Sequence, residues 1–102
     1  MAASTKIVDF TGPGSFALTT PAVGDVHSLL MLGVTNLGGM VFQVEDSDGT
    51  QLTGPIILSD LQQFVTNIGT TSAPLAATAA GKGLKLKILS GGRLTGLAIV
   101  DA

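Results

Sequence analysis

The residues able to do chemistry in this 102-residue chain are few, and their spacing favours structural roles. His27 is the only histidine, and its neighbour Ser28 would point to the opposite face of a shared strand, away from the imidazole. No serine stands in a G-x-S-x-G nucleophile elbow. We therefore expect His27 to be a surface or hydrogen-bonded structural histidine, and we expect no catalytic residue and no enzymatic activity.

Two further motifs resemble ligand sites only superficially. Asp46-Ser47-Asp48-Gly49 follows Glu45 like an acidic calcium loop, but 50–58 contains no later acid to complete six to eight oxygen ligands. Asp-Gly is instead typical of a hairpin turn. Gly81-Lys82-Gly83 lacks the upstream glycine and the following Ser or Thr of a phosphate loop, so it also predicts a turn.

The composition excludes several other classes of site. The chain has no cysteine, which excludes disulfides, thiolate metal sites and cysteine catalysis. Paired carboxylates of the glycosidase type stay open, because any two of the seven acids could converge, but no Trp or Tyr offers a platform for a sugar. The expectation is therefore no metal and no cofactor.

Charge and hydropathy also limit the partners. Only five residues are basic and the net charge is −2, which disfavours binding to a phosphate backbone. The N-terminus has no basic patch followed by an apolar segment, so we expect no secretory signal, and the apolar runs are too short to span a bilayer. We expect a soluble protein that contacts neither nucleic acid nor membrane.

The last part of the chain indicates the local structure that positions these residues. Leu84, Leu86 and Ile88 alternate with Lys85 and Lys87, which is typical of a half-buried strand. A second apolar run extends over 93–100. Ser90-Gly91-Gly92 lies between the two runs and predicts a hairpin closed by a short glycine turn.

Short strands separated by turn residues are expected along the rest of the chain. Gly12-Pro13-Gly14 and Asn36-Leu37-Gly38-Gly39 are predicted turns. A helical turn competes at 59–65, where Leu61, Phe64 and Val65 have helical spacing, but we favour extended structure over 64–68. The predicted strands are 6–10, 15–20, 26–36, 40–45, 50–53 with 56–58, 64–68, 84–88 and 93–100.

This spacing predicts an all-β fold. Seven or eight short strands, 8–12 residues apart, are typical of an antiparallel β-sandwich or a jelly-roll-like barrel. We expect a single domain over 6–102, preceded by a flexible arm over 1–5 whose residues are small and polar.

The final strand is apolar on both faces, which predicts a partner. Leu94, Ala98 and Val100 share one face, and Leu97 and Ile99 lie on the other. One core covers only one of these faces, so Leu97 and Ile99 are predicted contacts in a symmetric homo-oligomer, for which a trimer is expected. Further contacts are expected in the arm, which could add backbone hydrogen bonds to a neighbouring sheet through Ala2, Ala3, Ser4 and Thr5.

The order of motifs over 40–102 resembles small β-sandwich proteins of tailed bacteriophages, namely capsid decoration (cement) proteins and head-fibre domains. The likeness rests on Asp46-Ser47-Asp48-Gly49, Leu52-Thr53-Gly54-Pro55, Phe64-Val65, Gly81-Lys82-Gly83-Leu84-Lys85-Leu86, Leu89-Ser90-Gly91-Gly92 and Leu94-Thr95-Gly96. The resemblance implies a viral structural protein on the virion surface, made in the host cytoplasm, that binds the major capsid protein and stabilises the head. A tail, baseplate or fibre jelly-roll module, with or without carbohydrate binding, is the alternative.

Overall fold

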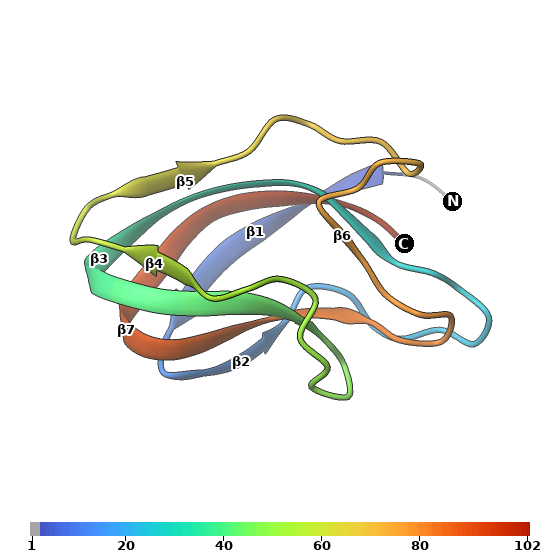
Figure 1. Cartoon of the computed structure of the whole chain (residues 1–102), viewed down its shortest axis with the longest axis horizontal. Helices are drawn as coiled ribbons and strands as arrows, with labels where there is room; N and C mark the ends of the chain where they lie inside the picture. Colours follow the sequence, from blue (N-terminus) through green and yellow to red (C-terminus); the bar gives the residue numbers. More distant parts are fainter. Residues whose placement is uncertain (1–2) are drawn as a thin grey trace.

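The computed structural model describes residues 3–102 and consists of seven strands in one antiparallel sheet (Figure 1). No helix occurs within these residues, which confirms the all-β prediction. The strands are β1 (Ala3–Thr11), β2 (Gly14–Ala17), β3 (Ser28–Asp46), β4 (Ile56–Leu58), β5 (Gln63–Val65), β6 (Ala76–Ala77) and β7 (Leu84–Asp101).

Two long strands, β3 and β7, form the centre of the sheet and pair with each other from Ser28↔Asp101 to Asp46↔Leu84. Along the far edge of β7, β1 pairs with 93–101 and β2 pairs with 85–88. The short strands β4, β5 and β6 pair with successive parts of the far edge of β3. Every other strand is therefore positioned by β3 or β7.

Two predicted hairpin turns are wrong. Ser90-Gly91-Gly92 lies within β7, and Asn36-Leu37-Gly38-Gly39 lies within β3. The glycines face each other across the ladder, where the register shifts between Leu37↔Arg93 and Met40↔Gly91. Glycine adopts a positive φ without steric strain, which a bend can require as well as a turn. Here the glycines allow two paired strands to bend together.

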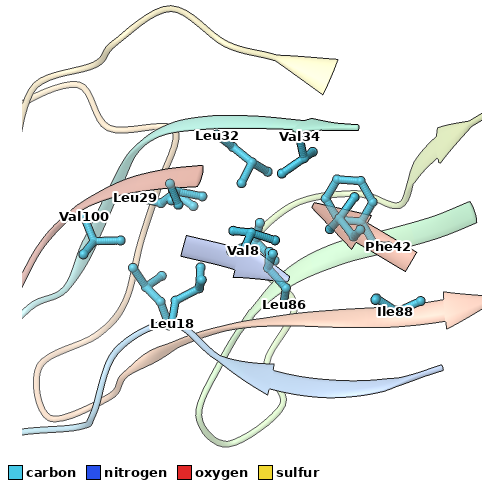
Figure 2. Close-up of a cluster of buried hydrophobic side chains, with 14 of the residues drawn as sticks. Val8, Leu18, Leu29, Leu32, Val34, Phe42, Leu86, Ile88 and Val100 are labelled. Carbon is cyan, nitrogen blue, oxygen red and sulfur yellow. The ribbon is translucent and has the colours of Figure 1, made fainter. Parts of the chain in front are cut away.

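The bend divides the sheet into two halves that face each other (Figure 1). We call β1, β5, β6, 28–37 of β3 and 93–101 of β7 the β1 half, and β2, β4, 40–46 of β3 and 84–90 of β7 the β2 half. Buried apolar side chains from both halves meet between them, including Val8, Leu32, Phe42 and Leu86 (Figure 2). Burial of this apolar surface stabilises the fold.

Aromatic pairs also connect the two halves. Phe10 of β1 stacks on Phe16 of β2, with ring centroids 4.6 Å apart. Phe42 of β3 packs edge-on against Phe64 of β5, with centroids 6.2 Å apart. Such pairs add roughly 0.5–1.5 kcal/mol beyond the area that they bury.

The N-terminal segment differs from the expected arm. Ala3, Ser4 and Thr5 belong to β1 and pair with Asp101, Val100 and Ile99, because the end of β7 extends far enough to hold them. Met1 and Ala2 of the predicted arm lie outside the described residues. The turn predicted at 46–49 is present, since the Gly49 amide donates to the Asp46 carbonyl oxygen at 3.0 Å.

Candidate interaction surface

His27 lies in a buried hydrogen-bond cluster at the start of β3. Its side chain is 2% exposed, and Nδ1 lies 2.7 Å from the Thr19 hydroxyl oxygen. That oxygen also accepts a bond from the Leu84 amide at 2.8 Å, so it connects the His27 ring to the start of β7. The His27 amide in turn donates to the Thr78 hydroxyl oxygen at 3.0 Å. The cluster joins four chain segments, and the expected hydrogen-bonded structural role of His27 agrees with this geometry.

Backbone amides stabilise the acidic turn at 46–49 by hydrogen bonds to the Asp46 side chain. One carboxylate oxygen of Asp46, Oδ1, accepts bonds from the Asp48 and Thr50 amides, both at 2.9 Å. The bond from Thr50 is the main cause that holds the pKa of Asp46 below its usual 3.8. Asp48 pairs with Lys82, so the two motifs at 46–49 and 81–83 contact each other in a surface ion pair.

The outer face of the β2 half is polar at its centre, and Ile57 and Leu89 are exposed on it nearer the bend. Lys85 lies opposite Glu45 in the ladder, with 3.7 Å between the Lys85 Nζ and Glu45 Oε1 atoms, and Lys87 lies opposite Gln43. Gln43 donates a side-chain hydrogen bond to Glu45. This face therefore carries a connected set of charged and amide groups.

The outer face of the β1 half carries a continuous apolar row at its centre. Paired residues on neighbouring strands share a face, and Ile7 pairs with Leu97, Leu97 with Gly33, and Gly33 with Val65. Ile99 pairs with Met31 in the next row. We call Ile7, Met31, Val65, Leu97 and Ile99 the outer apolar face.

The side chains of the outer apolar face are accessible and adjoin one another. Ile7 is 75% exposed, Val65 is exposed, and Leu97 is 37% exposed, while Met31 and Ile99 are half-buried. The Met31 methyl group lies 3.0 Å from the position that a Cβ on Gly33 would take, and the nearest Val65 methyl lies 4.0 Å from it. Met31 thus fills the space above Gly33 and joins the two rows.

An ion pair borders this apolar surface. Arg93 donates two hydrogen bonds to the Asp9 carboxylate, Nε to Oδ1 at 2.9 Å and an Nη to Oδ2 at 3.0 Å. These bonds are the main cause that lowers the pKa of Asp9 and raises the pKa of Arg93. The surface therefore has an apolar centre and a charged border.

The predicted contact residues fall in the same region of the fold. Leu97 and Ile99 point outward while Leu94, Ala98 and Val100 are buried in the core, as the alternation indicated. Thr5 pairs with Ile99 on the outer side, and Ala3 and Ser4 are exposed in the same strand. Ala2 lies outside the described residues.

Sequence reasoning missed three members of the outer apolar face. Ile7 carried a usable signal, because it alternates with Val8 and Phe10 and is the one apolar residue on the Asp9 side of its strand. Met31 and Val65 carried none, since they lie in segments without a clear period of two, and the long-range pairing of β3 with β5 brings them together.

Within residues 3–102 the surface holds no pocket and no group of three or more His, Asp or Glu side chains placed to bind a metal. In the same part of the chain, no helix has the length and hydropathy to cross a membrane. No family model, curated protein or solved structure matches the chain.

Proposed function

We propose that this protein is a non-enzymatic structural subunit that binds other proteins through its outer apolar face. The observation that carries the proposal is a continuous row of apolar side chains on the outer face of the β1 half, where the outer face of the β2 half carries a ladder of charged and amide groups. Side chains such as Ile7, Leu97 and Val65 lie outside the hydrophobic core between the two halves, and exposed apolar groups that adjoin one another favour protein contacts.

The specific form of this role is a viral capsid decoration protein. It would form a symmetric homo-oligomer on the virion, bind the major capsid protein and stabilise the head. The support is the resemblance of 40–102 to phage cement and head-fibre proteins, together with a surface that offers an apolar contact and a charge content of only 12%. In this proposal the two facing halves of the bent sheet act as the two layers of a β-sandwich.

The test compares capsids that lack the protein with capsids to which it is restored. Purified wild-type protein should rebind and raise the temperature at which the particles release their genomes. Leu97→Lys should lose rebinding, because it places a charge in the apolar contact. Leu89→Lys is the matched control, since Leu89 lies on the same strand in the other half and is 41% exposed.

The decoration role fails if complete and protein-free particles release their genomes at the same temperature and the purified protein does not rebind. A tail, fibre or carbohydrate-binding role would then take precedence. Equal loss of rebinding in both variants would also contradict a contact centred on the outer apolar face.

A further inference from the structure

β1 offers an unpaired backbone edge of nine residues. It pairs with β7 in one unbroken register from Ala3↔Asp101 to Thr11↔Arg93, and no strand within residues 3–102 pairs with its other edge. Folded proteins usually protect such edges with prolines, bulges or several charges. β1 has no proline, no bulge and only two charged residues, Lys6 and Asp9.

The geometry of the strand limits how a second copy could pair with this edge. Two identical edges meet antiparallel only around a twofold axis perpendicular to the sheet, so the outer faces of both copies lie on the same side. Residues directly opposite each other must then share a face, which permits only registers centred on a residue. The register centred on Ile7, the middle residue of β1, is the one that pairs all nine residues.

The charge pattern also favours the register centred on Ile7. In that register Lys6 lies opposite Val8 of the second copy, and Asp9 lies opposite Thr5, whose hydroxyl group can donate to the carboxylate. A register centred on Lys6 would place two ammonium groups opposite each other, and one centred on Val8 would place Ile7 opposite Asp9. The strand is thus self-complementary around Ile7.

The same register joins the outer apolar faces. Within one copy a single row crosses Val65, Gly33, Leu97 and Ile7, and Ile7 is its last member at the free edge. With Ile7 opposite Ile7 of the second copy, the row continues without interruption into the second sheet. Pairing therefore buries the most exposed apolar side chains of this row against each other while it satisfies backbone groups.

We propose that two copies of this chain pair β1 to β1, antiparallel and centred on Ile7, into one continuous sheet with a shared outer apolar face. The proposal rests on the structural role proposed above and specifies the contact between copies in it. A twofold contact gives two copies or an even multiple, where the two apolar faces of the final strand had led us to expect a trimer.

Single cysteines test the register directly, because the chain has no cysteine of its own. Directly opposite side chains have Cβ atoms about 4.5–5.5 Å apart, close to the spacing of a disulfide. Under mild oxidation, Ile7→Cys should form covalent dimers. Ile57→Cys, at a residue that is 74% exposed against 75% for Ile7, should not.

A mixture of two single-cysteine variants tests the residue pairs on either side of Ile7. Thr5→Cys combined with Asp9→Cys should form mixed disulfides, whereas Thr5→Cys alone should not, since its equivalents would lie about 14 Å apart at 3.4 Å per residue. Equal crosslinking of Ile7→Cys and Ile57→Cys, or of Thr5→Cys alone and in the mixture, would overturn the register.

Sedimentation equilibrium tests the pairing of the two copies without a covalent crosslink. The wild type should give at least twice 10.2 kDa, and Ile7→Lys should give 10.2 kDa because two ammonium groups would meet at the axis. Ile57→Lys should sediment like the wild type. Circular dichroism checks that both variants fold.

The outcomes separate this inference from the proposed function. The β1 pairing would be overturned if the wild type is a monomer or a trimer, or if Ile7→Lys leaves the oligomer unchanged. Capsid binding would still be decided by the rebinding experiment. Dimers that crosslink through Ile7→Cys but do not rebind to capsids would support the pairing and contradict the decoration role.

Discussion

Thr19 shows how much a single hydroxyl group can hold together in this fold. It accepts the Leu84 amide hydrogen bond and lies against His27 Nδ1, so it connects the segment after β2 to the starts of β3 and β7. Thr19→Val keeps the shape of the side chain but leaves both buried partners unsatisfied.

We expect Thr19→Val to lower the free energy of unfolding by about 1–3 kcal/mol, the usual penalty for a buried polar group that loses its partner. Urea denaturation measures it. Thr20→Val is the control at an exposed neighbour, where a change within about 0.5 kcal/mol is expected. Equal losses in the two variants would contradict the role assigned to the Thr19 hydroxyl.

At the scale of residues, the sequence predicted local structure better than long-range contacts. It indicated that His27 is structural and that Asp46-Ser47-Asp48-Gly49 is a turn, because both conclusions depend on neighbouring residues. It could not indicate that Thr78, 51 positions from His27, would receive the His27 amide hydrogen bond, since that depends on how β6 and β7 return to β3.

Among the elements, β7 depends on Gly91 for its bend. Gly91 has φ 120°, and a Cβ there would lie 2.3 Å from Met40 Cβ and 2.4 Å from the Gly39 carbonyl oxygen. Those atoms belong to the paired strand, so neither can move without breaking the ladder at the bend.

Gly91→Ala should therefore lower the free energy of unfolding by more than about 1 kcal/mol, since alanine adds both backbone strain and a clash. Thermal or urea unfolding measures the change. Gly54→Ala is the control, because Gly54 has an ordinary φ and no atom within 4 Å of an added Cβ. A loss at Gly91 no larger than at Gly54 would show that the bend tolerates a side chain.

The sequence identified most strands but not their continuity. Glycine pairs mark both turns and bends, so local pattern alone predicted hairpins where β3 and β7 run through. A signal was present nonetheless. The buried apolar residues of β7 keep even numbers on both sides of Gly91, from Leu84, Leu86 and Ile88 to Leu94, Ala98 and Val100, as expected of one strand.

For the molecule as a whole, self-association would make thermal stability depend on protein concentration. Because pairing through β1 requires the folded strand, it stabilises only the native state. Each tenfold rise in concentration adds about 1.4 kcal/mol per pair, which corresponds to a Tm increase of roughly 3–6 °C for a chain of this size.

Calorimetry or differential scanning fluorimetry at several concentrations measures this shift. The Tm of Ile7→Lys should not change with concentration, while that of Ile57→Lys should follow the wild type. The same concentration dependence in both lysine variants would place the contact between copies elsewhere.

The composition predicted an excess of apolar surface, but not its location. The charged fraction is only 12%, against about 25% in typical globular domains, and the sequence assigned part of the resulting apolar surface to Leu97 and Ile99. Ile7, Met31 and Val65 join them only because β1 and β3 flank β7 and β5 pairs with β3 in the folded sheet. The face is a product of topology, which local periodicity does not encode.

The pairing of β1 with the end of β7 also bears on how the chain folds. The Arg93 side chain that binds Asp9 is 84 positions away, and within residues 3–102 β1 pairs only with a segment about 90 positions further along the chain. Nearly every ladder in the sheet involves β7 or crosses a long loop, so the contact order is high and loop closure must precede most of the stabilising contacts. β1 therefore stays unpaired in a folding chain until residues 93–101 are available to it.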